Sequence, residues 1–92
     1  MIIVCYDFSN DRIRAKFAKF LDQHGRKIQY SVYELKHSKR VLDSILDEIE
    51  YRFRKHFTAS DSILIFQICA QDKKKIVRYG FPCLEEKEVV ML

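Results

Sequence analysis

Two runs of almost uninterrupted apolar residues constrain the fold of this 92-residue chain more than any other feature. The runs are IIVCY at positions 2–6 and ILIFQIC at positions 63–69. Side chains alternate between the two faces of a sheet, so a strand that is apolar at nearly every position is typical of a central strand with both faces buried. We therefore expect a central strand at each of these two places.

A helical segment follows the first strand directly. Ser9 and Asn10 can each accept a hydrogen bond from the unpaired backbone amides of a helix start, so either residue can cap it. The pattern predicts a helix to about His24, closed by Gly25 in a left-handed conformation. Its apolar stripe consists of Ile13, Phe17, Phe20 and Leu21.

A second helical segment lies between the middle of the chain and the second apolar run. Ser38 is the expected cap, and the helix is expected to end near Phe57. Its apolar stripe consists of Leu42, Ile45, Ile49 and Phe53, with Leu46 beside it.

The segment GRKIQYSVYELK, at positions 25–36, lies between the two helices and is rich in strand formers. It is long for one strand, so it forms either one bent strand or two strands that reverse near Tyr30 and Ser31. With two strands the order is βαββαβ, which is the ferredoxin-like α+β plan with two helices on one face of a mostly antiparallel sheet. Additional C-terminal strands are expected at positions 76–80 and 85–92.

One face of such a sheet has no helix over it. A strand that is apolar on both faces, such as residues 2–6, is poorly suited to face water. A second copy of the chain, packed sheet against sheet, would cover this face. We therefore predict a homodimer.

Basic charge is concentrated in one part of the sequence. Residues 12–40 contain nine Lys and Arg against two acidic residues, a net charge of +7 in a chain whose total is +4. A basic patch suits a polyanion such as nucleic acid, but it also occurs as a solvated face that confers solubility. Under the first interpretation, Arg12, Arg14 and Arg26 are candidate phosphate ligands.

The cysteines and histidines argue against several kinds of site. Cys5, Cys69 and Cys83 are odd in number and have no CxxC spacing, which speaks against a disulfide framework and against a zinc site. The three histidines show no paired ligand spacing. No stretch has the features of a signal peptide or the length to span a membrane, so we expect a cytoplasmic protein with no membrane partner.

Asp7 ends the first strand, where a side chain can emerge into a cleft or an interface. By itself, it is better explained as a strand-end or capping aspartate. In a homodimer with Asp7 near the two-fold axis, two carboxylates would converge, and a Mg²⁺ ion between them would relieve their repulsion. Ser31 and Tyr33 either serve a turn and packing or line the same cleft and touch a phosphate or a base.

The stretch YDFSNDRIRAKFAKFLDQHGRKIQYSVYE, residues 6–34, resembles the signature of the second core CRISPR-associated protein family, Cas-two. The signature is an apolar strand ending in Tyr-Asp, a polar turn, basic residues opening a helix, and then G-x-R-x-Q-x-S-V-[FY]-E. The matching residues are Tyr6, Asp7, Asn10, Asp11, Arg12, Arg14, Gly25, Gln29, Ser31, Val32, Tyr33 and Glu34. One departure is that Arg26 follows Gly25 directly and Lys27 takes the position that often holds Arg.

The resemblance implies a ferredoxin-like homodimer, with residues 1–80 as the core and residues 81–92 as a strand extension that crosses to the partner. It implies a Mg²⁺ site shared by Asp7 of the two protomers, with Asp7 as the catalytic residue. The nucleic-acid-binding candidates are Arg12, Arg14, Lys19, Arg26 and Lys27. The cleft-lining candidates are Tyr6, Asn10, Asp11, Ser31 and Tyr33.

The resemblance implies two roles, which need not coincide. One is a metal-dependent endonuclease acting on RNA or duplex DNA. The other is a non-catalytic DNA-binding scaffold that bridges dimers of the CRISPR-associated integrase during spacer integration. A third class, a regulatory domain that binds a small molecule, predicts no salt-sensitive affinity for nucleic acid. An Asp7 substitution separates the first two, because it abolishes cleavage in the nuclease and spares DNA binding in the scaffold.

Overall fold

The computed structural model describes residues 1–69, 77 and 79 of the chain. The elements are the strand β1 (Ile2–Asp7), the helix α1 (Asp11–Asp22), the hairpin strands β2 (Gly25–Gln29) and β3 (Val32–Leu35), the helix α2 (Lys39–Glu48) and the strand β4 (Ser62–Gln67). After α2 the chain continues through a π-helical turn (Ile49–Phe53) and a 3₁₀ turn (Arg54–His56).

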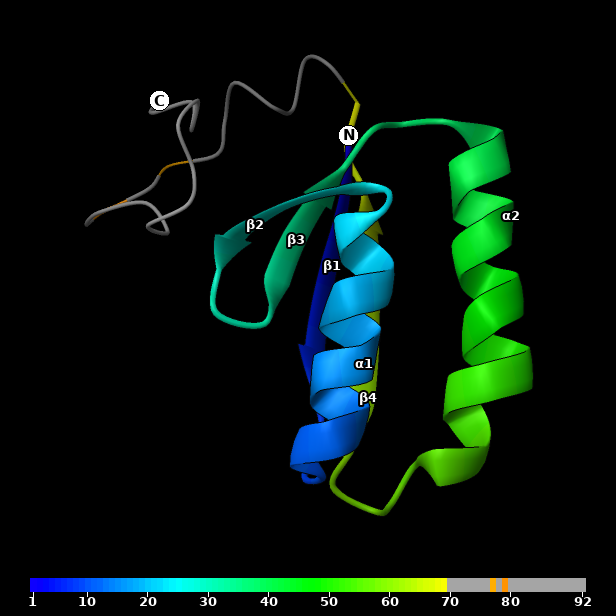
Figure 1. The fold of residues 1–92 in the computed structure, drawn as a ribbon. Helices are drawn as coiled ribbons and strands as arrows, with labels where there is room; N and C mark the ends of the chain where they lie inside the picture. The colour runs from blue at the N-terminus through cyan, green and yellow to red at the C-terminus, as the bar shows by residue number, and fades with distance from the viewer. Residues whose placement is uncertain (70–76, 78, 80–92) are drawn as a thin grey trace.

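The four strands form one antiparallel sheet in the order β2-β3-β1-β4. Both helices lie on the same face of this sheet, as Figure 1 shows. The middle segment therefore splits into two strands, with the reversal at Tyr30 and Ser31. This confirms the predicted ferredoxin-like α+β plan.

Both helix starts have the side-chain caps that their sequences predict. The Asn10 side chain accepts a hydrogen bond from the Ile13 amide at 3.0 Å, so Asn10, and not Ser9, caps α1. Ser38 caps α2 by accepting from the Val41 amide at 3.4 Å. Each bond satisfies one of the backbone donors that a helix start leaves unpaired.

Gly25 does not close α1 in a left-handed conformation, so that prediction is wrong. The helix ends at Asp22, and Gly25 is already the first residue of β2, with no left-handed φ. A Cβ at this position would lie 2.1 Å from the Glu34 carbonyl oxygen and 2.6 Å from Cδ2 of Leu35. Glycine is required here because β3 passes too close for any side chain.

The hydrophobic core lies between the sheet and the helices. Ile2, Val4 and Tyr6 of β1 are buried there, in line with their alternate positions along the strand. Aromatic rings from both helical segments meet them, and the rings of Phe17 and Phe53 pack edge to face with centroids 4.9 Å apart. One face of β1 is therefore fully buried.

The prediction that both apolar strands are central holds for β1 only. β1 pairs with β3 on one side and β4 on the other, but β4 lies at the edge of the sheet that residues 1–69 form. Leu64 and Phe66 of β4 remain 58% and 50% exposed. Within the described residues, their apolar character therefore does not reflect burial.

The expected strands at positions 76–80 and 85–92 lie outside the described residues, as does the expected extension 81–92. No helix among the described residues is long and apolar enough to cross a membrane.

Candidate functional site

Asp7 is the last residue of β1, and its side chain is exposed. It pairs with Ser62 of β4 and lies on the same face as Ile3 and Cys5, because alternate residues of a strand share a face. That face is the one opposite the helices, and we call it the open face. Within residues 1–69, the Asp7 carboxylate has no hydrogen-bond or ion-pair partner.

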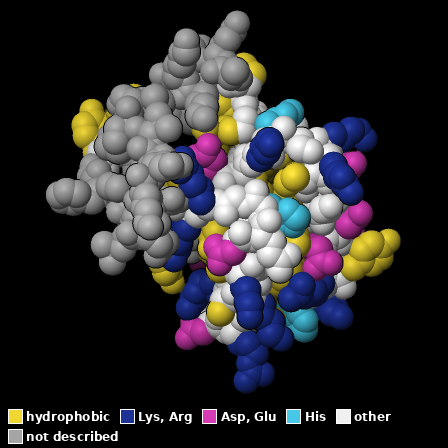
Figure 2. Space-filling model, turned by 45° about the horizontal axis from the view of Figure 1, so that its top comes forward, with side chains coloured by type: hydrophobic (Ala, Val, Ile, Leu, Met, Phe, Trp, Pro, Cys, Tyr) yellow, Lys and Arg dark blue, Asp and Glu magenta, His cyan; other side chains and the backbone are white. Residues whose placement is uncertain are grey.

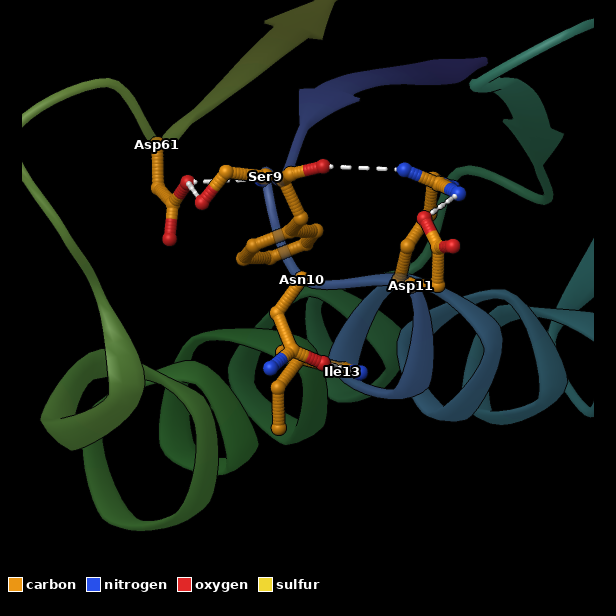
Figure 3. Close-up of polar contacts among 7 residues, drawn as sticks. Ser9, Asn10, Asp11, Ile13 and Asp61 are labelled. Atoms are coloured by element: carbon orange, nitrogen blue, oxygen red, sulfur yellow. Dashed lines mark hydrogen bonds and ion pairs between the residues drawn. The ribbon is translucent and has the colours of Figure 1, made fainter.

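Two other carboxylates lie at this end of the sheet, and both are already occupied (Figure 3). Asp11 accepts a hydrogen bond and forms an ion pair with Arg14. Asp61 accepts from the Ser9 amide at 2.9 Å, the Ser9 hydroxyl at 3.1 Å and the Thr58 amide at 3.0 Å. Asp7 is therefore the one carboxylate of the three that is left open to a cation.

The hydrogen bonds to Asp61 also change its acidity. The backbone amides of Ser9 and then Thr58 stabilise the charged form and lower the pKa of this carboxyl below its ordinary value. Asp61 is consequently ionised throughout the neutral range, which keeps it a strong acceptor.

The loop between β1 and α1 is held from two sides. Nη1 of Arg14 donates to the Phe8 carbonyl at 3.0 Å, and Asp61 holds Ser9 from the turn before β4. The chain segment that follows Asp7 is therefore fixed to both α1 and β4, as Figure 3 shows. A carboxylate on such a supported strand end is well positioned to hold a ligand in one geometry.

Tyr6 and Tyr33, two of the cleft-lining candidates, lie on the opposite face of the sheet from Asp7. Both are buried in the core. The Tyr33 hydroxyl donates to Oδ1 of Asp22 at 2.7 Å. Burial, followed by the nearby charge of Asp22, raises the pKa of Tyr6 to about 12. Neither tyrosine shares a surface with Asp7.

The other three cleft-lining candidates support local structure. Asn10 caps α1, and Asp11 is paired with Arg14. Ser31 lies in the β2–β3 turn with a φ of 61°, and its carbonyl oxygen accepts from the Tyr6 amide at 3.1 Å. Ser31 therefore joins the hairpin turn to β1 one residue before Asp7.

The five nucleic-acid-binding candidates lie on two elements, α1 and β2, and differ in their partners. Arg12 and Lys19 are exposed on α1, whereas Arg14 is partly buried and holds the loop before it. Arg26 lies 3.7 Å from Oε1 of Glu34, and Nζ of Lys27 lies 5.7 Å from the centre of the Tyr30 ring. Figure 2 shows Lys and Arg side chains gathered in the lower part of the face in view, with acidic side chains among them.

The open face carries both apolar and charged residues. Strand register places Ile3, Cys5, Val32, Leu64 and Phe66 on it, together with the ion pair of Arg26 and Glu34, and with Asp7 and Ser62 at one end. Burial raises the pKa of the Cys5 thiol, so this side chain is a neutral, apolar part of the surface.

Sequence reasoning missed Asp61 and its partners Ser9 and Thr58. A turn was predictable from the polar run TASDS, residues 58–62, before an apolar strand. The contact of Asp61 with Ser9, 52 residues away, depends on the pairing of β1 with β4 and has no local signal.

Known proteins similar to this chain point to one family. The family model described as CRISPR associated protein Cas2 matches residues 1–76. A relative from Synechocystis sp. named "CRISPR-associated endoribonuclease Cas2 2" is 33% identical over 91% of this chain and 88% of its own length. A relative with the same name from Methanospirillum hungatei JF-1 is 30% identical over 98% of this chain and 97% of its own length.

Solved structures show a similar fold. The hypothetical protein TT1823 from Thermus thermophilus has a TM-score of 0.69 and 27% identity, covering 92% of this chain and 95% of that one. Streptococcus pyogenes Cas2, solved at pH 6.5, has a TM-score of 0.66 and 19% identity, covering 86% of this chain and 98% of that one. At that identity the second similarity concerns the fold alone.

Proposed function

This chain belongs to the family of CRISPR associated protein Cas2, and from that premise we propose that it is a metal-dependent endonuclease with Asp7 as its catalytic carboxylate. The relatives from Synechocystis and Methanospirillum are named endoribonucleases, so RNA is the first substrate to test and duplex DNA the second.

One observation carries the assignment to Asp7. Of the three carboxylates at this end of the sheet, Asp11 and Asp61 are engaged by internal donors, whereas Asp7 is exposed and has no partner within residues 1–69. A carboxylate in this state can bind a divalent cation without first breaking an internal hydrogen bond.

The metal-binding side chains of one protomer suit a metal site that two protomers share. No group of three His, Cys, Asp or Glu residues that could hold a metal occurs within the described part of the chain. Mg²⁺ usually binds through one or two carboxylates, with water and phosphate oxygens completing its coordination. Asp7 from each of two protomers, together with a nucleic-acid phosphate, would supply such a set.

The open face supports the homodimer that this site needs. Packing two copies sheet against sheet would remove Leu64 and Phe66 from water, which stabilises the dimer by roughly 1 kcal/mol for each half-exposed side chain. Asp7 lies at one end of the same face, so a two-fold axis near that end would bring the two carboxylates together.

In the proposed mechanism the two Asp7 carboxylates would hold the cation, and the bonds at Phe8 and Ser9 keep the strand end in place. A divalent cation held there would supply positive charge against the scissile phosphodiester and lower the pKa of bound water. Arg12 and Lys19, exposed on α1, hold substrate phosphates without reading sequence. Cleavage of RNA and duplex DNA by the wild type and by Asp7→Asn tests this proposal.

The exposed basic residues of α1 favour a second function, the binding of DNA without cleavage. Arg12 and Lys19 have no acidic partner within residues 1–69, so their charge is available to phosphates. In this alternative the homodimer binds duplex DNA and bridges dimers of the CRISPR-associated integrase during spacer acquisition, and Asp7 is dispensable.

A further inference from the structure

We propose that Tyr30 is a stacking site for an unpaired nucleobase, with Lys27 beside it to hold the adjoining phosphate. This inference deepens the proposed function, because it names nucleic acid with at least one unpaired base as the preferred ligand.

The first observation is the exposure of Tyr30. Its side chain is 71% exposed at the tip of the β2–β3 hairpin, whereas Tyr6 and Tyr33 on the neighbouring strands are buried. Two-residue turns favour small or polar residues that suit the turn backbone, and a large aromatic ring at this place adds nothing to the core. An exposed ring with no packing role is free to contact a ligand.

The second observation is the positive charge around the ring. Nζ of Lys27 lies 5.7 Å from the centre of the Tyr30 ring, within the range of a cation–π contact. An aromatic face with a cation beside it is the combination that binds single-stranded nucleic acid.

The third observation is the position of the hairpin turn relative to Asp7. The Ser31 carbonyl accepts from the Tyr6 amide at 3.1 Å, so Tyr30 and Asp7 each lie one residue away from the same hydrogen bond. That bond attaches the backbone of the turn to β1 and so places Tyr30 at this end of the sheet. A strand whose base stacks on Tyr30 would therefore pass close to the end of β1.

Stacking on Tyr30 distinguishes unpaired from paired nucleic acid. In a duplex the faces of the bases are covered by their neighbours, and a protein reaches mainly phosphates and base edges. An unpaired base can leave the stack and place its face on an aromatic ring. Tyr30 should therefore contribute to the binding of single strands and very little to the binding of duplexes.

The test is fluorescence anisotropy with a labelled single-stranded RNA and a duplex of equal length, at low salt and without divalent metal, so that no cleavage occurs. Tyr30→Ala removes the ring and Tyr30→Phe keeps it. Tyr51→Ala is the matched control, because Tyr51 is 79% exposed but lies in the π-helical turn after α2, where Arg52 and Arg54 are already paired with Glu48 and Glu50.

We expect Tyr30→Ala to weaken single-strand binding about fivefold or more, which is the range for removal of one stacked base. Duplex binding should change less than about twofold, and Tyr30→Phe and Tyr51→Ala should bind both ligands as the wild type does. Unchanged single-strand binding in Tyr30→Ala, an equal weakening for the duplex, or an equal weakening in Tyr51→Ala would overturn the inference, as would a wild type that binds no single strand.

The outcome is separable from that of the proposed nuclease. Asp7→Asn should keep the Tyr30-dependent binding, because no metal is present in this assay. If Asp7→Asn loses cleavage while Tyr30→Ala binds normally, the nuclease stands and the stacking site fails. If Tyr30→Ala loses single-strand binding in a protein that cleaves nothing, the stacking site stands and the nuclease fails.

Discussion

Asp61 accepts hydrogen bonds from the amide and the hydroxyl of Ser9, at 2.9 and 3.1 Å, across 52 residues of sequence. The contact ties the turn before β4 to the loop that follows Asp7. The Asp61 carboxylate also accepts a hydrogen bond from the Thr58 amide. The strand end that carries the candidate metal ligand is therefore held by a residue from a distant part of the sequence.

Replacing Asp61 with Asn should lower the stability of the fold at pH 7 and make that decrease pH-dependent. The pKa of Asp61 is lowered in the folded state, so its ionised form stabilises the protein above the unfolded value near pH 4. This contribution is lost as the pH falls through the folded-state pKa. Thermal unfolding followed by circular dichroism should show a gap in Tm between wild type and variant at pH 7 that narrows toward pH 3.

Asp43→Asn is the matched control for this prediction. Asp43 pairs with Lys39 at 3.5 Å on the exposed side of α2, and surface pairs of this kind contribute little to stability. A Tm gap in Asp61→Asn that is no larger than in Asp43→Asn, or that is independent of pH, would show that Asp61 does not hold the loop.

Tyr33→Phe should destabilise the fold without impairing cleavage. The substitution removes the hydrogen bond to the Asp22 carboxylate, and a bond to a charged acceptor contributes about 1.5–3 kcal/mol to the free energy of unfolding. Tyr33 faces the core on the opposite side of the sheet from Asp7, so it does not contact substrate there. Urea unfolding measures the predicted loss of stability, and a cleavage assay on the same preparation measures whether activity is kept. A large fall in cleavage at unchanged stability would place Tyr33 in the site instead.

Leu64→Glu should convert the proposed homodimer to a monomer. Leu64 is 58% exposed on the open face, and a charge there would be buried between two sheets without a partner. Sedimentation equilibrium gives the mass directly. Leu46→Glu is the control, because Leu46 is 45% exposed on α2, over the other face of the sheet, and should leave the dimer intact. A dimeric Leu64→Glu variant or a monomeric wild type would rule out this interface.

Reversing the charge of Arg12 and Lys19 to Glu should weaken duplex DNA binding equally on unrelated sequences. The slope of log affinity against log salt should become shallower by roughly 0.9 for each DNA phosphate that the variant no longer neutralises. Arg52→Glu with Arg54→Glu changes the net charge by the same amount, but both arginines are paired with glutamates in the wild type. If that control weakens binding as much, net charge rather than the α1 surface determines affinity.

Local chemistry explains why much of the fold could be predicted from the sequence. The cap at Ser38 and the apolar stripe of α1 are encoded within a few residues, and both were confirmed. The reversal at Tyr30 and Ser31 was one of two alternatives that the sequence left open, and the structure shows two strands. The position of β4 was not predictable in this way. An apolar pattern on both faces of a strand indicates that both faces are buried. It does not indicate whether the residues that bury them belong to the same chain or to another.

The candidate site could be predicted only in part. Asp7 follows from a carboxylate at the end of an apolar strand, and strand alternation places Tyr6, its immediate neighbour, on the opposite face. The hydrogen bonds between Asp61 and Ser9 could not be predicted, because they arise only when β1 and β4 pair. Contacts of this kind are set by tertiary structure and leave no local pattern.

The most direct test of the central claim is cleavage of labelled RNA and duplex DNA by the wild type and by Asp7→Asn, each with Mg²⁺ and with a chelator. Asparagine keeps the size of the side chain but removes the charge that holds a cation. We predict Mg²⁺-dependent cleavage by the wild type and a decrease of about 100-fold or more in the variant, with binding retained. Equal cleavage by both proteins, or duplex binding with no cleavage by either, would contradict the nuclease, and the second result would support the scaffold.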